Sequence, residues 1–598
     1  MDMTAFANAS RELLQGGDPV GAEQVLAPVL NDLRADPSVT HLMGLIMKAQ
    51  NRLEDAERYF RSAVANALQD GQYYNDLAVV LQARGNHGEA AKVFRAAIAL
   101  LPQVGLVRVN LVSCLMATGD LAEAEREARA YLALSNSSEA WALLSTVQRA
   151  LDRREDSLGS AEAAVRLAPN DRALRHAHAV ALDRAGHIEG AVHAYRTLAQ
   201  QGLDTAELAL NFARALYAIG RHAEAESVLD QTVAHWPSAG AAHAALARMR
   251  WLRGEGEKCT RAIEEELQRR PDDASLYLVC ADALHRGHHE AKALRILEQA
   301  LTRVSPTPGL LTAMGIVLDE LDRPEEGLAH LRRVAALTGN AANARRNLLS
   351  TLLRAGRPDE ALHVARSLRA NDPEEQYLLA VEATALRMLG GEGYRALYDY
   401  GAFVRTFEIP APRGFFTADN FNASLTDWLR IQHHKWAHPL DQTLENGTQT
   451  GRSLLSFDEP NIKAFLSAVD GAVRTYLSDL PEIPGHPFTQ RKRRDFYRFS
   501  GCWSVRLRKG GFQPNHVHDR GWISSAYFPA LPASMGEDKA GWLKFGEPNR
   551  AIAGCGADHY VQPKKGLLVL FPSYMWHGTL PFSEGEERLS VAFDVVPA

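Results

Sequence analysis

A regular pattern of small, large apolar and turn-forming residues runs through the first two-thirds of the chain. Ala90, Phe94 and Ala97 follow Gly85 at helical spacing, and Pro102 closes the segment. Apolar residues three and four apart lie on one helix face, so the segment predicts two helices joined near Gly85. The pattern returns every 33 to 35 residues, and most turn positions hold Gly, Asn or Asp, which tolerate turns. The turn positions are Gly17, Asn51, Gly85, Gly119, Arg153, Gly186, Gly220, Gly254, Gly287, Asp322, Gly356 and Gly390.

This period and this order of small and large positions are typical of tetratricopeptide repeats, and we predict about 11–12 of them. One helix pair cannot bury its apolar face alone, so neighbouring pairs stack into an all-α superhelix whose surface usually holds an extended peptide or another protein. The alternative is that the array is only a spacer or a dimerisation arm. The period ends after Gly390, and a connector from Glu408 to Pro412 predicts domains of residues 1–407 and 408–598.

The pattern changes after this boundary. Two amphipathic helices are expected over residues 424–436 and 458–480, the second capped by Asp458 or Asn461. Beyond them, apolar and β-branched segments bounded by Gly and Pro predict short strands. Helices followed by a run of strands indicate a β core braced by flanking helices. The predicted strands cover residues 495–508, 521–532, 540–547, 566–572 and 588–596.

Three histidines fall in or beside the predicted strands. His516 and His518 are two residues apart, so both imidazoles can aim at one point if this segment is a strand or a strand end. His577 closes the apolar run GLLVLFPSYMWH. A close pair plus one remote histidine is how metal sites are assembled in jelly-roll folds, and such a facial set suits non-haem Fe(II) as well as Zn, Cu or Ni. Asp519 is an alternative carboxylate ligand, which a bend or bulge would turn towards the site.

Arg588 and Ser590 stand two residues apart in the apolar segment RLSVAFDVV. A guanidinium is a planar, permanently charged fork that fits a carboxylate, and a serine hydroxyl on the same strand face could donate to the same group. The alternative is a surface pair between Arg588 and Glu586 or Glu587. The apolar surroundings favour the first interpretation, because a buried guanidinium needs a partner.

Composition narrows the class of protein. A length of 598 residues exceeds one ordinary core, and 46% hydrophobic and 23% charged residues are typical of soluble globular proteins. A net charge of −6 gives no general footprint for nucleic acid or membrane. Five scattered cysteines fit a reducing compartment, and neither a signal peptide nor a membrane span is expected. We therefore expect a cytoplasmic protein with no nucleic-acid or membrane partner; the sequence assigns no oligomeric state.

The motif HxH…H…RxS, with GWISSAY and LFPSYMWHGTLPF around it, resembles that of the 2-oxoglutarate/Fe(II)-dependent oxygenases that carry N-terminal tetratricopeptide repeats. The likeness covers roughly the last 190 residues. It implies a double-stranded β-helix (jelly-roll) domain, Fe(II) held by the three histidines, and 2-oxoglutarate bound by Arg588 with Ser590. In the wider superfamily the first motif is usually His-x-Asp or His-x-Glu. His518 therefore stands where a carboxylate is usual, and Asp519 remains its rival.

The resemblance further implies a dioxygenase that consumes O2, converts 2-oxoglutarate to succinate and CO2, and hydroxylates a C–H bond. It implies no catalytic side chains beyond the metal ligands, because metal and cosubstrate carry the chemistry. The repeats make a protein or peptide the expected substrate. Two alternatives stay open: a three-histidine metal dioxygenase or binding module that does not use 2-oxoglutarate, and a repeat scaffold with an inactive metal domain. Carboxylate binding at Arg588 distinguishes the first alternative.

Overall fold

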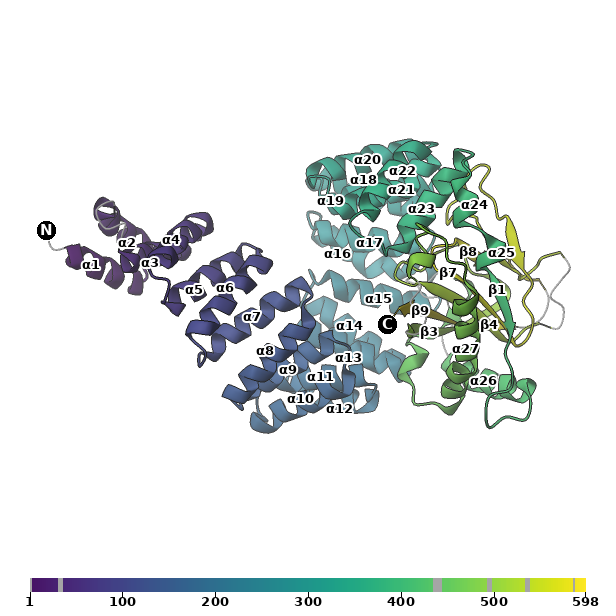
Figure 1. Cartoon of the computed structure of the whole chain (residues 1–598), viewed down its shortest axis with the longest axis horizontal. Coiled ribbons are helices and arrows are strands. Elements are labelled where there is room, and N and C mark those ends of the chain that lie inside the picture. The colour runs from purple at the N-terminus through teal and green to yellow at the C-terminus, as the bar shows by residue number, and fades with distance from the viewer. Residues whose placement is uncertain are drawn as a thin grey trace. The chain divides into compact units, whose positions relative to one another are not determined.

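The chain forms two compact units, Met1–Ala215 and Leu216–Ala598. Among the residues that the structure describes, the first unit contains only helices, whereas the second continues the helices and ends in β-sheets (Figure 1). The domain boundary expected between residues 407 and 408 stays a prediction. The computed structural model describes residues 3–30, 36–433, 444–491, 497–532, 538–583 and 587–597.

Consecutive helices of the first unit pack against each other as antiparallel pairs. Each pair buries small and large apolar residues at the predicted positions: Ala90, Phe94 and Ala97 are fully buried in α6. The helices are α1 (Met3–Gln15), α2 (Pro19–Leu26), η1 (Ala27–Val29), α3 (Pro37–Ala49), α4 (Leu53–Asn66), α5 (Gly71–Ala83), α6 (His87–Leu100), α7 (Gly105–Thr118), α8 (Leu121–Leu134), α9 (Ser138–Ala150), α10 (Arg154–Leu167), α11 (Arg172–Ala185), α12 (Ile188–Gln200) and α13 (Ala206–Ala218), which crosses into the second unit.

The helix pairs of the second unit follow the same plan and stack one after another (Figure 1). They are α14 (His222–His235), α15 (Gly240–Leu252), η2 (Gly256–Thr260), α16 (Arg261–Arg269), α17 (Ala274–Arg286), α18 (Glu290–Arg303), α19 (Pro308–Glu320), α20 (Pro324–Leu337), α21 (Ala342–Arg354), α22 (Pro358–Arg369), α23 (Gln376–Met388), α24 (Gly393–Leu397) and α25 (Tyr400–Phe403). The all-α tetratricopeptide array is thus confirmed.

The turns explain why the repeat was readable from the sequence. Ten of the twelve predicted turn positions adopt the left-handed conformation, with φ between 59° and 94°, which closes a helix by bonding its last carbonyls. At the other two, the left-handed residue is a neighbour: Asp152 in place of Arg153, and His288 in place of Gly287. Gly287 instead lies against the ring of Trp251, where a Cβ would come within 2.8 Å of the ring.

The strands form two antiparallel sheets, one of six strands in the order β1-β7-β4-β9-β3-β2 and one of three in the order β6-β5-β8. This arrangement confirms a jelly-roll-like domain after the repeats. The predicted strands correspond to β3, β4, β5, β7 and β9, and the shorter strands β1, β2, β6 and β8 were missed. The bounds are β1 (Arg405–Glu408), β2 (Glu445–Gln449), β3 (Tyr497–Phe512), β4 (Ile523–Ala530), β5 (Leu543–Phe545), β6 (His559–Val561), β7 (Leu567–Pro572), β8 (His577–Thr579) and β9 (Glu587–Pro597).

Two helices flank the large sheet, α26 (Ala418–Gln432) and α27 (Pro460–Asp479), with short turns η3 (Leu454–Ser456) and η4 (Thr489–Arg491). They correspond to the two expected helices, although residues 434–436 lie outside the described part. The ring of Phe465 on α27 lies 5.1 Å from that of Tyr527 on β4, so α27 covers the sheet. The expected cap of α27 was wrong: Glu459 caps it, because Pro460 takes the first helical position.

Helix α23 belongs to two hydrophobic cores at once. Every residue from 378 to 385 is buried, as expected of a helix that is enclosed on all sides. One set of its side chains packs into the core of the last repeats, and another packs into the core of the jelly-roll. The first set is Leu378, Val381 and Ala385, and the second is Leu379, Ala380 and Ala383.

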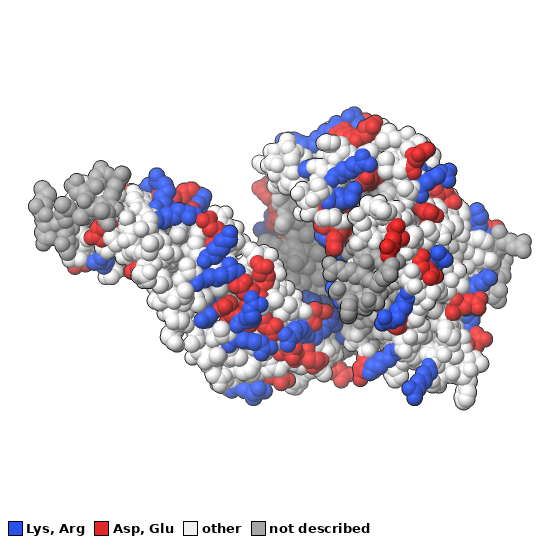
Figure 2. Space-filling view, viewed as in Figure 1, with Lys and Arg blue, Asp and Glu red and all other residues white. Residues whose placement is uncertain are grey.

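The surface carries charges of both signs. On the face drawn in Figure 2, Lys and Arg side chains are interspersed with Asp and Glu. Within the described ranges, none of the helices combines the length and the apolar character that crossing a bilayer requires.

Candidate metal centre

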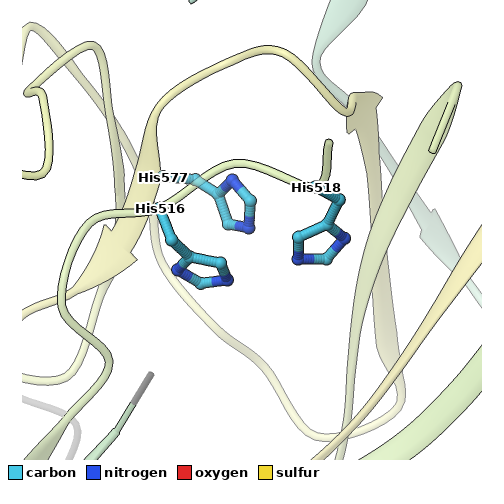
Figure 3. Close-up of side chains that lie close together, drawn as sticks. All are labelled: His516, His518 and His577. Atoms are coloured by element: carbon cyan, nitrogen blue, oxygen red, sulfur yellow. The ribbon is translucent and has the colours of Figure 1, made fainter. Parts of the chain in front are cut away.

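The structure brings the three predicted histidines together. His516 and His518 lie in the loop between β3 and β4, and His577 begins β8. One ring nitrogen of each lies within 4.8 Å of the other two. The ring centroids are 4.3 to 5.2 Å apart, and the rings face a common point (Figure 3). His577 is buried, and the other two are half-buried.

Backbone hydrogen bonds hold these distant segments side by side. His516 and His577 form an isolated antiparallel bridge, with N–O distances of 2.9 and 3.1 Å, and the amide of His518 donates to the carbonyl of Ser573 at 3.1 Å. The expected strand around His516 is therefore reduced to a single bridge. This bridge nevertheless sets two imidazoles against each other from segments some sixty residues apart in sequence.

The Nδ1 atoms of two of the rings are bonded to backbone carbonyls. Nδ1 of His516 lies 2.9 Å from the carbonyl oxygen of Pro514, and Nδ1 of His577 lies 2.9 Å from that of Met575. A carbonyl oxygen only accepts, so each Nδ1 carries the hydrogen and each Nε2 keeps its lone pair. This tautomer presents Nε2 as the ligand atom.

The third ring is oriented by a carboxylate that the sequence reasoning missed. Nδ1 of His518 lies 2.6 Å from Oδ1 of Asp594 on β9. The hydroxyl of Ser524 lies 2.8 Å from both of these atoms and from the hydroxyl of Ser573. A carboxylate behind a histidine fixes the ring and makes it a stronger metal ligand. The sequence contained a hint of this role: Asp594 is an even number of residues from Arg588 and so shares its strand face, in a segment that is mostly apolar.

Two of the three rings, those of His516 and His577, are held in the neutral form. Desolvation, helped by the neighbouring His518, lowers the pKa of His516 to about 4. Desolvation and the other two imidazoles hold the pKa of His577 well below its ordinary value. Protons compete with metals for the same lone pairs, so low pKa values keep the donors available at neutral pH. The arrangement can therefore accept a cation.

Asp519 does not join this group. Its Oδ2 lies 2.6 Å from Nη2 of Arg346 on α21, and its backbone carbonyl accepts from the amide of Gln376 at 3.0 Å. The candidate carboxylate thus contacts the repeat helices, and the nitrogen cluster consists of the three histidines.

Arg588 is fully enclosed, with 1% of its surface exposed. Its Nη1 donates to the carbonyl of Gly541 at 2.8 Å, and its guanidinium carbon lies 5.0 Å from the centre of the Phe528 ring. Its Nε is buried without a partner among the described residues. Desolvation lowers the pKa of Arg588 to about 10, and none of the described carboxylates offsets it. A buried cation of this kind needs an anion.

The alternative of a surface ion pair between Arg588 and Glu587 is not observed. The carboxylate of Glu587 accepts from Nε of Arg430 at 2.7 Å and from Nε of Arg506 at 2.6 Å, while Glu586 lies outside the described residues.

The face of β9 that carries Arg588 is the face that meets the histidines. Alternate residues of a strand share one side, and β9 pairs with β3 without interruption from Arg588 to Asp594. Arg588 therefore shares its side with buried Ser590 and with Asp594, which contacts His518.

Comparison with known families agrees with this picture. Residues 501–594 match the family described as "Putative 2OG-Fe(II) oxygenase", and this range contains all three histidines, Arg588 and Ser590. Tetratricopeptide-repeat families match residues 42–104, 81–147, 176–229, 210–274 and 312–375. The chain thus carries tetratricopeptide repeats followed by a domain of this oxygenase type. The comparison with curated proteins gave no match.

Solved structures of repeat proteins are similar to parts of this chain. MamA from Desulfovibrio magneticus RS-1 is 16% identical, with 28% of this chain and 97% of that chain covered and a TM-score of 0.27. A tetratricopeptide repeat protein from Parabacteroides merdae is 19% identical (42% and 98% covered, TM-score 0.29). YrrB, described as having an unusual peptide-binding site, is 18% identical (31% and 95% covered, TM-score 0.26). No function is carried over at these scores.

Proposed function

We propose that this protein is a 2-oxoglutarate- and Fe(II)-dependent oxygenase, with iron bound by His516, His518 and His577. Arg588, assisted by Ser590, binds the far carboxylate of 2-oxoglutarate. The observation that carries the proposal is the buried Arg588 guanidinium, which has no carboxylate partner among the described residues. A buried cation without a carboxylate partner, on the strand face that also carries Asp594 behind His518, fits an anionic cosubstrate that also binds metal.

The residues at the site fit Fe(II) and 2-oxoglutarate. Three imidazole nitrogens suit Fe(II), and a facial set leaves further positions on the metal for cosubstrate and O2. When bound, iron and 2-oxoglutarate supply the oxidative decarboxylation to succinate and CO2 and the oxidation of a C–H bond. The chain's part is to orient and enclose. Pro514, Met575 and Asp594 fix the rings, and the ring of Trp503 packs 5.3 Å from that of His518.

The substrate in this proposal is a protein or peptide that the repeats recruit and the oxygenase hydroxylates. The first helices of three successive pairs, α17, α19 and α21, line an open cavity of about 500 Å³. Its walls are largely apolar, including Leu278 and Ile316, and Asn343 and Asn347 stand one helical turn apart on one side. Apolar walls accept a side chain, while amides can bond an extended backbone, which is how stacked repeats commonly hold polypeptides.

The test starts from purified protein loaded with Fe(II) under anaerobic conditions. Adding 2-oxoglutarate should produce a metal-to-ligand absorption band, and admitting O2 should then release succinate. His577→Ala should give neither signal, because one lost ligand breaks a three-point site. His559→Ala is the matched control, since His559 is half-buried on β6 outside the cluster. Iron-loaded wild-type protein with no band and no succinate would overturn the proposal.

One alternative keeps specific support. Among the described residues, the candidate metal-binding group consists of three histidines without a carboxylate. This set also fits a three-histidine dioxygenase that does not use 2-oxoglutarate. Stoichiometric iron binding without an absorption band would favour that enzyme.

A further inference from the structure

The loop that carries two of the histidines is tied to the last repeats. Nη2 of Arg346 on α21 lies 2.6 Å from Oδ2 of Asp519, the residue after His518. The first amide of α23, from Gln376, donates to the carbonyl of Asp519 at 3.0 Å. The next loop residue, Arg520, pairs with Asp372 at 2.8 Å. Side chain and backbone of the loop are thus both held from the repeat side.

The segment that carries the third histidine meets the same helices. Nε1 of Trp576, the residue before His577, donates to Oγ1 of Thr384 on α23 at 3.0 Å. The ring of Tyr377 meets Trp576 edge-on at 6.2 Å, and the guanidinium of Arg346 stacks over Tyr377 at 4.5 Å. Arg346 therefore touches one histidine segment directly and the other through a single aromatic ring.

We propose that Arg346 is a positioning residue for the metal site: by holding Asp519, it fixes the loop in which His516 and His518 face His577. The inference rests on the proposed metal binding by these histidines. It assigns a role to the repeats that differs from recruitment, because α21 and α23 would complete the geometry of the centre. A metal site is sensitive to such support, since ligands must be held close to their productive positions.

The size of the effect follows from exposure. Arg346 and Asp519 have 33% and 48% of their side-chain surface exposed, so solvent screens their ion pair. Losing such a pair should weaken metal affinity roughly twofold to fivefold, about 0.4–1 kcal/mol, if the free energy of the pair is expressed only in the bound geometry. A pair that merely joins two modules would change thermal stability and leave metal affinity alone.

The test uses the full chain and Co(II), whose visible absorption reports ligand number and geometry. Affinity is measured for wild type, Arg346→Met, Asp519→Asn and the double variant, with circular dichroism and melting temperature recorded for each. We expect each single variant to weaken Co(II) binding by about twofold to fivefold and the double variant by no more, because partners in one interaction are not additive. Arg346→Lys should restore part of the loss, since it keeps the charge.

The pair of Lys565 and Asp419, which lie 2.7 Å apart and do not touch the histidine loop, supplies the control. Lys565→Met and Asp419→Asn should leave Co(II) affinity unchanged. Single variants with wild-type affinity, or additive losses in the double variant, would overturn the positioning role while leaving the proposed oxygenase standing. Absence of Co(II) binding in wild type would instead remove the proposed metal site and this inference with it. Asp519→Asn changes an exposed loop residue, so it keeps the test decisive if an Arg346 variant misfolds.

Discussion

Oδ1 of Asp594 lies 2.6 Å from Nδ1 of His518, so a carboxylate stands behind one ring of the histidine cluster. From the family resemblance, a carboxylate is usual in the position of His518, and Asp519 was the alternative. In the structure the carboxylate that contacts this ring comes from Asp594 on β9, where it orients the imidazole.

Removing this orienting carboxylate should weaken the metal site. Partners of this kind typically contribute about tenfold to a hundredfold to metal affinity, and we expect Asp594→Ala to lose that much in a Co(II) titration. Asp594→Asn should lose less, because an amide oxygen can still accept from Nδ1. Asp427→Asn, an exposed aspartate on α26, is the control. Wild-type affinity in Asp594→Ala would mean that the ring is held by its other contacts alone.

The ligand assignment can be tested against its rival. His518→Ala should abolish stoichiometric Fe(II) binding, whereas Asp519→Ala should leave a site that is weaker by only a few-fold, because its carboxylate contacts Arg346. Iron content after gel filtration measures both. Equal losses in the two variants would make Asp519 the ligand after all.

Arg588 should control the affinity for 2-oxoglutarate and leave that for iron intact. A charge-assisted pair in a buried pocket contributes about 1.5–3 kcal/mol, so Arg588→Ala should weaken 2-oxoglutarate binding roughly tenfold to a hundredfold. Arg588→Lys should do less harm, since it keeps the charge but loses the fork. Titration of the absorption band in anaerobic Fe(II)-loaded protein gives the 2-oxoglutarate affinity of each variant. An unchanged titration in Arg588→Ala would take this residue out of the site.

The metal-free protein should lose stability as the pH falls. The folded state holds the pKa of His516 at about 4 instead of 6.5, so between these values the unfolded chain binds more protons and acid favours unfolding. The contribution is at most about 3.4 kcal/mol, at about 1.4 kcal/mol for each pH unit. His516→Gln removes the titrating group, and its melting temperature should fall less than that of wild type between about pH 7 and about pH 5. Parallel curves would exclude His516 as the source.

A fragment of residues 408–598 should not fold on its own, although this is the predicted domain. It lacks α23, α25 and most of β1, and with the two helices the fully buried Ala380 and Phe403. A fragment of residues 342–598 keeps α21 to α23 and should unfold cooperatively in thermal denaturation followed by near-ultraviolet circular dichroism. Native-like spectra and cooperative unfolding of the shorter fragment would show that the jelly-roll core is complete without α23.

The repeats were readable because their turns depend on local chemistry. A left-handed turn selects Gly, Asn or Asp at a fixed period, as at Gly85 and Asp322. The short edge strand β1 gave no such signal, because Arg405–Glu408 alternates between half-buried and exposed residues and gains its place only by pairing with β7. In β6 the three residues are all half-buried, so this strand shows no alternation.

The site was readable only in part, for a similar reason. Three histidines and the pair of Arg588 and Ser590 carry their chemistry in the motif, whereas the role of Asp594 depends on which ring a strand brings near it. Arg346 lies 173 residues from Asp519 and on a different type of structure. Contacts between residues that are far apart in sequence leave no pattern in the spacing of residues. The sequence therefore indicates the candidate ligands but not the residues that orient them.

Few substitutions should be tolerated in the buried part of helix α23. From residue 378 to residue 385 it has no exposed face on which neutral substitutions could accumulate, and a change of volume on either side would need compensation in a different core. Glu382 adds a constraint, because its two carboxylate oxygens are taken by Arg366 and Arg369. The jelly-roll part could therefore not be grafted onto a foreign repeat array at the connector. Any viable exchange in its ancestry would have had to carry this helix along with it.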